Sequence, residues 1–532
     1  MKTKAHILLM ILLTLTTAGA FAQNGDQVQF SAARVKGETQ GSQKFRVFYS
    51  SPEKRVIIKK GTSTVYCDKA KENTQTKFVT ATGNVIVIDK KTKIYGDMLT
   101  YDRTKGEIVI TDNKRVKLVD EEVTLYTDKL YYYSDTQTAK YLTGGEVHKE
   151  SMILTSKKGY LKDKQLDFEG NVVIDDPEKH RHLESEAITY MRDTEIATFN
   201  TETHITSQDG DVVAQSGTYN TKTGDVKFKG DAVVENDDYL IIGDFIDTQK
   251  DTGDSYAKGN VIFYSKTDSV TIYADELFHQ GNDTRAYGNA LMSRPIQGNF
   301  ENMFYMAADT LHSVHDSTSK ETTLYAFHSV EVENRDLQAK CDSLVYFYND
   351  SMIYFYEDPV IWAQGTQMVG RTIRAMMTSR GMEKLYLDKN AFVISEDSLK
   401  NHNQVKGRQI VANFKDGKTL DNVNVNGNGQ SIYYILEEGQ IKNLNIVKCS
   451  KMTMTFEEKG SLKDLIYNDK NDSQLLPAGD INKQNSHLPG FRLRTEERPA
   501  REEIIKRLRN RKNTPPNLPI DPNLRAKLDI NK

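Results

Sequence analysis

The amino-acid sequence predicts an all-β fold built from short repeated units and followed by a short helical tail. Two sequence motifs recur at a regular spacing, and the segments between them alternate apolar and polar residues, which is the period of a strand with one buried face. Helical spacing of apolar residues is absent from the repeated region. We therefore expect an elongated, repeat-built array of antiparallel strands.

The first motif is a Gly-Asn pair followed by an apolar residue. Its clearest copies are Gly83-Asn84-Val85, Gly170-Asn171-Val172, Gly259-Asn260-Val261 and Gly288-Asn289-Ala290. The asparagines of these copies lie 87, 89 and 29 residues apart, which corresponds to three, three and one units of about 29 residues. Weaker copies are Gly145-Glu146-Val147, Gly230-Asp231-Ala232, Asp358-Pro359-Val360 and Lys389-Asn390-Ala391. The array is expected to run from about Phe45 to Tyr467.

The second motif lies midway through each unit and consists of a small residue, an acid, any residue and an aliphatic residue, as in Ala274-Asp275-Glu276-Leu277. Apolar residues on its two sides are five positions apart, as in Ile94 and Leu99 or Met306 and Leu311. In a straight strand an odd spacing points the two side chains to opposite faces, so a bulge or corner must lie between them if both reach one core. Each unit is thus predicted to be strand, corner, strand and turn.

The second motif also explains two of the three cysteines. Cys67 and Cys341 stand at its small-residue position and are expected to be packed thiols rather than a redox pair. With Cys449 they are too few and too scattered for a disulfide framework.

Stacked units would add one strand layer each at about 4.8 Å, giving a body on the order of 60 Å long. Two facing antiparallel sheets would enclose an apolar seam, and the terminal repeats would leave unpaired strand edges. The side chains predicted to line this seam are Val85, Leu99, Leu130, Val172, Ile188, Val261, Leu277, Leu311, Leu344 and Ile373. The competing interpretation is that these residues only pack against one another as a closed core.

The domain organisation follows from the limits of this array. Residues 1–22 have the charged, apolar and small-residue layout of a secretory signal peptide, and their apolar run is too short to span a membrane. No cysteine follows the predicted cleavage site, so the usual acceptor for a bacterial lipid anchor is missing. The remaining segments are expected to be a linker at 23–44, repeat segments at 45–292 and 304–470, a break or insertion at 293–303, and a basic, Pro-containing tail at 471–532.

Composition narrows the class of protein. A mean hydropathy of -0.60 with 27% charged residues is very polar, whereas 27 Tyr and 20 Phe argue against disorder. The net charge of -3 gives no general attraction to nucleic acid, which is excluded as a partner. Hydrolase, metalloprotease and phosphate-loop motifs are absent from the sequence, so no enzyme, cofactor or metal site is expected. Exposed loop positions are expected for His180, His182, His312 and His315.

The C-terminal tail differs from the repeats. Between Arg492 and Lys512 nine basic residues stand against four Glu, a local balance of +5. Pro499 is expected to begin a helix whose apolar residues are Ile504, Ile505 and Leu508. Such a helix would contact anionic lipid headgroups or a partner protein. A solvated tail is the equal alternative.

The repeats with Gly-Asn-Val and Ala-Asp-x-Leu elements resemble those of the OstA/LptA family of lipopolysaccharide-transport proteins. The resemblance covers residues 45–290 best and 300–470 less well, and the tail segment 488–499 resembles the ending of OstA-like proteins of the Bacteroidetes type. It implies an open β-jelly roll whose groove shields the acyl chains of lipopolysaccharide or a related lipid. It further implies a carrier or bridge in the periplasm, associated with the outer membrane, that meets other envelope transport proteins or copies of itself by strand-edge pairing.

Two other classes of protein remain open as alternatives. An outer-membrane β-barrel also has alternating strands, although this chain lacks a terminal aromatic strand and carries many charges on the polar strand faces. A carbohydrate-binding or adhesive β-solenoid is the second alternative. Such a protein should gather aromatic residues or carboxylates on one outer face.

Overall fold

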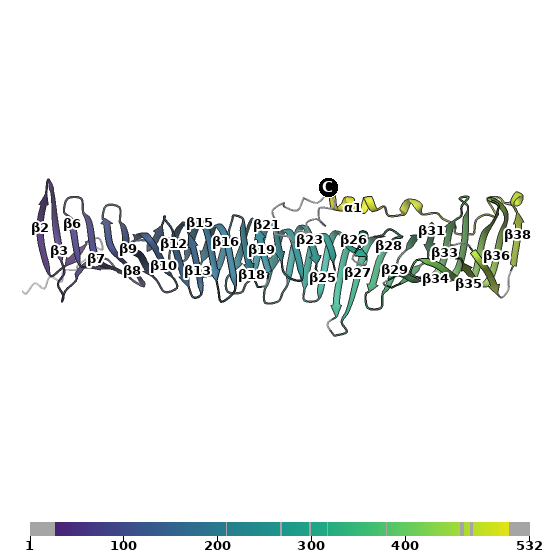
Figure 1. Ribbon diagram of the computed structural model, residues 1–532, viewed down its shortest axis with the longest axis horizontal. Coiled ribbons are helices and arrows are strands. Elements are labelled where there is room, and N and C mark those ends of the chain that lie inside the picture. The colour runs from purple at the N-terminus through teal and green to yellow at the C-terminus, as the bar shows by residue number, and fades with distance from the viewer. Residues whose placement is uncertain are drawn as a thin grey trace, which may run out of the picture. The chain divides into compact units, whose positions relative to one another are not determined.

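The computed structural model describes residues 27–208, 210–266, 269–296, 299–316, 318–378, 380–457, 462–468 and 472–509 (Figure 1). The chain divides into two compact units, residues 1–163 and 164–532, and each is described by itself. The described part is nearly all strand with antiparallel pairing, and its single α-helix lies near the C-terminus, which confirms the predicted all-β class. The predicted signal peptide, residues 1–22, lies outside the described residues.

Within residues 27–163, the described part of unit 1, there are fourteen strands. Their bounds are β1 Gln29–Ser31, β2 Arg34–Gln40, β3 Gln43–Tyr49, β4 Val56–Lys60, β5 Ser63–Cys67, β6 Lys69–Asn73, β7 Phe78–Asp89, β8 Thr92–Asp102, β9 Glu107–Val119, β10 Thr124–Tyr133, β11 Thr138–Tyr141, β12 Gly145–Lys149, β13 Met152–Ser156 and β14 Lys158–Leu161.

Unit 2 contains the remaining described elements. Its first strands are β15 Gln165–Asp176, β16 Arg181–Met191, β17 Ile196–Phe199, β18 Thr203–Ser207, β19 Gly210–Ala214, β20 Ser216–Asn220, β21 Val226–Glu235, β22 Tyr239–Thr248, β23 Ser255–Ser265, β24 Val270–Gln280, β25 Asp283–Ile296 and β26 Asn299–Asp316. The later strands are β27 Glu321–Glu333, β28 Leu337–Phe347, β29 Met352–Tyr356, β30 Val360–Ala363, β31 Thr366–Val369, β32 Thr372–Thr378, β33 Gly381–Glu396, β34 His402–Lys415, β35 Thr419–Glu437, β36 Gln440–Phe456, β37 Leu462–Asn468 and β38 Asp472–Pro477. The helical elements are the 3-10 turns η1 Ala478–Asp480 and η2 Thr495–Glu497 and the helix α1 Arg501–Arg509.

Two predicted segments have a different structure. Residues 23–44 were expected to be a linker, but the described part contains β1 and β2, and β2 pairs with β3 along its whole length. The sequence hides this strand because almost all of β2 is exposed and lacks apolar alternation. The expected break at 293–303 belongs to the β25–β26 hairpin, in which Ser293 lies opposite Tyr305 and Pro295 opposite Met303.

The long strands bend at the Gly-Asn motif. Gly259 and Asn260 in β23 have left-handed φ values of 75° and 50°, and both oppose the single residue Asp275 of β24. Two residues against one form a β-bulge, which bends the strand. As predicted from the odd spacing, Ile272 and Leu277 on the two sides of the bend are both buried.

In unit 2 each long strand bends, and the half-strands on the two sides of the bends form two walls, each named here after one of its buried residues. The Leu277 wall comprises residues 245–248, 255–258, 276–280, 283–287, 310–316, 321–327, 343–347, 352–356, 372–378, 384–388, 409–415, 419–426 and 451–456. The Val261 wall comprises residues 239–243, 261–265, 270–274, 290–296, 303–308, 330–333, 337–341, 360–363, 366–369, 391–396, 402–407, 429–437 and 440–449. One hydrophobic cluster contains buried residues of both, for example Met306 and Leu311, so the walls face each other.

Unit 1 is built in the same way. The Leu99 wall comprises residues 78–82, 98–102, 107–111 and 129–133, and the Val85 wall comprises residues 56–60, 63–67, 85–89, 92–96 and 116–119. Both walls line one small cavity of about 30 Å³, with Ile58 and Val65 on one side and Leu99 and Ile108 on the other. A space of this size holds roughly one water molecule.

Candidate functional site

The ten residues predicted to line a seam all lie in the interior of their units. Each is at most 3% exposed, and the list is Val85, Leu99, Leu130, Val172, Ile188, Val261, Leu277, Leu311, Leu344 and Ile373. A groove and a closed core would both bury these side chains. Their role as groove residues therefore stays a prediction.

Strand register brings the residues of the Leu277 wall into one row. Leu277 lies opposite Ala286, Ala286 opposite Leu311, Leu311 opposite Ala326, and Ala326 opposite Leu344. The row continues through Phe355 to Ile373. Leucine and alanine thus alternate across the first five neighbouring strands. The alanines were not predicted, although each stands in the inward phase of its strand.

The predicted valines on the opposite side face smaller neighbours. Val85 lies opposite Gly96, Val172 opposite Ser185, and Val261 opposite Ala274. These positions are next to the bends, where the walls converge. The valines therefore lie beside the bends of their own units, and in unit 2 Val261 and the row that contains Leu277 lie on different walls.

Polar residues bridge the two walls of unit 1 at the end of the strands farthest from the bend. The hydroxyl of Tyr132, on the Leu99 wall, donates to Asp89 Oδ2 on the Val85 wall at 2.8 Å. Thr62 donates to the other oxygen of Asp89 at 2.7 Å, and Lys60 forms an ion pair of 3.1 Å with Asp135. We call Lys60, Asp89, Tyr132 and Asp135 the mouth residues.

Two of the mouth residues, Asp89 and Tyr132, are held in a desolvated environment, whereas Asp135 is largely exposed. Asp89 and Tyr132 are each 1% exposed. Burial, together with the neighbouring Asp89 carboxylate, raises the pKa of the Tyr132 phenol. Burial lowers the pKa of Lys60, but hydrogen bonds to Tyr101 and Asp135 outweigh it and the pKa is raised. Tyr132 is therefore a neutral donor and Lys60 a cation at neutral pH.

Sequence reasoning missed the mouth residues. Asp89 follows Val85 and Val87 at the same spacing of two, and Tyr132 follows Leu130 in the same way, so both continue an inward phase. The sequence did contain a signal, an acidic residue at a strand position where the alternation predicts an apolar, inward side chain. An acid buried in this way needs a partner.

The tail of unit 2 lies on the outer face of the Val261 wall, where it runs back along the strands to α1 (Figure 1). We call residues 486–504 the C-terminal strap. The side-chain amide of buried Gln404 accepts from Leu488 N–H and donates to Ser486 C=O, both at 2.8 Å. Gln367 holds the main chain of Arg494 and Arg492 in the same manner, at 2.7 and 2.8 Å.

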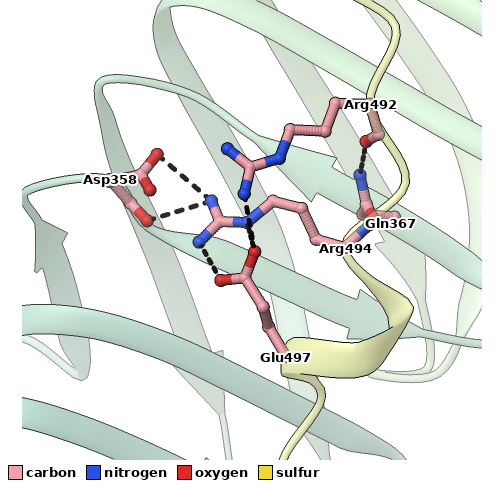
Figure 2. A network of polar contacts seen from close by, with 5 residues as sticks. All are labelled: Asp358, Gln367, Arg492, Arg494 and Glu497. Atoms are coloured by element: carbon pink, nitrogen blue, oxygen red, sulfur yellow. Dashed lines mark hydrogen bonds and ion pairs between the residues drawn. The ribbon is translucent and has the colours of Figure 1, made fainter.

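Arg494 anchors the middle of the strap (Figure 2). Its guanidinium donates to both carboxylate oxygens of Glu497, at 3.0 and 2.7 Å, and to Asp358 Oδ1 at 3.1 Å. The Arg494 side chain is only 7% exposed, so these partners replace most of its hydration. Such desolvated bidentate pairs are stronger than surface ion pairs.

The predicted tail helix is present but begins at Arg501, two residues after Pro499. Ile504 is 1% exposed and packs with Leu291, Met303, Tyr305 and Ala307. The helix therefore uses Ile504 to contact the chain's own Val261 wall. Of the two alternatives predicted for the tail, the solvated one does not describe residues 486–504, which dock on the chain's own wall through Leu488 and Ile504. Contact of the helix with anionic lipid headgroups or a partner stays a prediction.

The histidine prediction is partly wrong. His180 is exposed in a turn, but His182, His312 and His315 lie in β16 and β26 rather than in loops. His182 contacts Asp175 at 2.6 Å, and His312 contacts Asp283 at 2.9 Å. Within the described ranges no group of three or more His, Cys, Asp or Glu is placed to hold a metal ion.

The cysteines are buried free thiols, as predicted for Cys67 and Cys341. Burial raises the pKa of both thiols to about 12. Because the thiolate is the reactive form, these cysteines are inert packing residues.

No helix in the described part of the chain is long and apolar enough to cross a membrane. A family model described as OstA-like protein matches residues 49–180. This match begins in β3 and includes the first bends and the mouth residues. No curated protein matches the chain.

Two solved structures show low similarity. LptH is the LptA homologous periplasmic component of the conserved lipopolysaccharide transport device from Pseudomonas aeruginosa; it is 20% identical over 21% of this chain and 80% of its own, with a TM-score of 0.18. The WD40 domain of SCAP from fission yeast is 8% identical over 70% of this chain and 93% of its own, with a TM-score of 0.12. Both TM-scores are too low for either structure to establish the fold of this chain. Residues 49–180 therefore form an OstA-like domain, which confirms the resemblance predicted from the two motifs.

Proposed function

We propose that this protein is a periplasmic carrier or bridge that shields the acyl chains of lipopolysaccharide, or a related lipid, between its walls on the way to the outer membrane. The observation that supports this most is the inward aliphatic row, which repeats from strand to strand. The OstA-like match of residues 49–180 agrees with the proposal.

The two walls can separate at low cost to the backbone. The described strand ladders of the central repeats run within a wall, and the interior between walls is made of side chains. Opening the seam exposes apolar surface without breaking those ladders. An acyl chain that enters regains about 0.8 kcal/mol for each CH₂ group removed from water.

The repeated row also suits movement along the seam. A ligand slides only where no single layer holds it much more tightly than the next. The alternation of Leu277, Ala286, Leu311, Ala326 and Leu344 offers similar apolar contacts at each pair of strands. Such a row would bind an acyl chain with similar affinity at each position along the seam.

The mouth of unit 1 fits the polar end of such a lipid. Tyr132, Asp89 and Lys60 lie at the rim, while Leu99 and Leu130 lie deeper. An amphiphile would place its tails against the leucines and its headgroup beside the rim. When these rim residues bind one another, they close the seam.

The proposal is tested by titrating the purified protein with a fluorescent fatty-acyl probe whose emission rises in apolar surroundings. Saturable binding that lipopolysaccharide displaces is the expected result. A closed core would give no saturable signal. In cells, depletion of the protein is expected to increase permeability to detergents, and unchanged permeability would count against a role in transport.

A further inference from the structure

Aromatic side chains form rows on the outer face of the Leu277 wall. Phe245, Tyr256, Phe278 and Tyr287 come from four successive strands, and their neighbouring ring centroids lie 6.1, 4.5 and 5.8 Å apart. These residues alternate with the inward row, since Leu277 precedes Phe278 and Ala286 precedes Tyr287. The rings are therefore on the opposite side of the wall from the seam.

The rows continue across the following strands. The rings of Tyr325 and Phe327 in β27 are nearly parallel, with an interplanar angle of 3° and centroids 6.1 Å apart. Tyr354 and Tyr356 in β29 repeat this arrangement at 10° and 6.2 Å. Arg374 lies 4.6 Å from the ring centroid of Tyr386. The face thus carries rings from β22 to β33.

Part of this aromatic face is open to solvent. Phe278 is 43% exposed and Tyr356 is 37% exposed. Large aromatic side chains left exposed on one face of a sheet are candidates for ligand contact. Cross-strand ring pairs also stabilise a sheet, so the rings alone do not identify a ligand. The charged side chains between the rings must indicate what it is.

The charged groups among the rings compensate one another. Lys258 pairs with Glu276 at 2.8 Å, Arg285 with Asp283 at 2.9 Å, and Arg374 with Asp388 at 2.9 Å. The face therefore has many hydrogen-bonding groups but no excess of one charge to select an anion. This combination fits a neutral ligand rich in hydroxyl groups.

The other outer face of the same unit shows a different chemistry. There the Val261 wall presents Phe392, Ile394, Ile432 and Leu444, which a peptide segment covers. Buried glutamines such as Gln404 satisfy the main chain of that segment. The aromatic face carries rings and ion pairs instead of such aliphatic side chains and buried glutamines. It therefore differs in chemistry from the face that the peptide covers.

We propose that the outer face of the Leu277 wall, from Phe245 to Tyr386, binds the sugar chain of the glycolipid whose acyl chains occupy the seam. This inference rests on the proposed function. The weakly positive C–H bonds of a sugar ring stack on the negative face of an aromatic ring. The ion pairs between the rings donate to and accept from its hydroxyl groups.

The test uses the full chain and a delipidated polysaccharide prepared from lipopolysaccharide, with binding measured by calorimetry. Phe278→Ala combined with Tyr356→Ala is expected to weaken binding at least tenfold. Phe278→Tyr combined with Tyr356→Phe keeps the ring faces and is expected to bind as the unsubstituted chain. Tyr95→Ala is the matched control, because Tyr95 is 38% exposed but lies in unit 1.

The outcomes separate this inference from the proposed function. If the polysaccharide does not bind, or if the double alanine variant binds it as well as the unsubstituted chain, the aromatic face is not a sugar site. The double variant should retain affinity for the fluorescent acyl probe. If the unsubstituted chain does not bind the acyl probe, the proposed function is contradicted. Binding of the polysaccharide would then stand as a result independent of that function.

Discussion

The side-chain amide of Asn260 donates to Oδ2 of Asp244 at 3.0 Å, across a strand pair and sixteen residues of sequence. Asn84 and Asp68 make the same contact at 2.8 Å in unit 1. The two motifs therefore meet at the bend, where the acid of one strand holds the left-handed asparagine of the next. Each bend turns two halves of a strand toward one interior, and this contact lies at the corner between them.

The glycine of the corner is predicted to be the least replaceable residue there. Gly259 has φ 75°, and an added Cβ would lie 2.5 Å from Asp244 Oδ2. Gly259→Ala should lower the free energy of unfolding by about 3 kcal/mol, the sum of a left-handed backbone cost and a steric clash. Gly253→Ala is the control, because Gly253 has φ 72° with nothing within 4 Å. Equal losses in chemical denaturation would show that the contact with Asp244 is unimportant.

Tying the mouth together is predicted to block lipid entry. The chain with Lys60→Cys and Asp135→Cys, joined by a short bis-maleimide, should lose binding of the fluorescent acyl probe to unit 1 because the walls cannot separate. The native thiols should not react, since Cys67, Cys341 and Cys449 are all buried and burial raises the pKa of each thiol. Each single variant with the same reagent is the control. Unchanged binding in the tied protein would mean that lipid does not enter at this mouth.

The strap is predicted to depend on its buried glutamines. Gln404→Ala leaves the N–H of Leu488 and the C=O of Ser486 without their partners, which should weaken docking by about 2 kcal/mol. Limited proteolysis should then cut the strap faster. Lys406→Ala removes only an exposed bond to Pro489 and should have a much smaller effect. Similar cleavage rates in both variants would contradict the assignment.

Glu333 should make stability depend on pH. It is 5% exposed beneath the strap, and burial raises the pKa of its carboxyl, with Arg501 lowering it and Glu502 raising it further. A raised carboxyl pKa means that the folded state loses stability as pH rises from the ordinary value of 4.5 through the raised value. Glu333→Gln should therefore increase the free energy of unfolding by about 1 kcal/mol at pH 7.

The control for Glu333 is the same comparison below pH 4, measured by thermal unfolding. There the carboxyl is protonated in both states, and the difference between the two proteins should disappear. A difference that is constant with pH would assign the effect to packing.

Local patterns predicted much of the fold. The odd spacing of Ile272 and Leu277 predicted the corner, because strand faces alternate with period two and only a bulge changes the phase. The second motif predicted its place, because its acid can hydrogen-bond nearby backbone amides at a corner. Both signals lie within a few residues of each other in the sequence.

Long-range contacts were beyond such patterns. Gln404 and Leu488 are 84 residues apart, and an isolated Gln in a polar strand gives no sign of its partner. Tyr132 and Asp89 meet only because the register of several strands places them at one mouth. The strand β2 was missed because its residues are almost all exposed.

Photocrosslinking in living cells tests the central claim most directly. A photoreactive amino acid is placed at Leu99 or Leu277, which face the interior, and at Thr100, which faces outward beside Leu99. The account predicts lipid adducts, identified by mass spectrometry, at positions 99 and 277 but not at 100. Adducts only within the protein itself at both interior positions would show a closed core and would contradict the account.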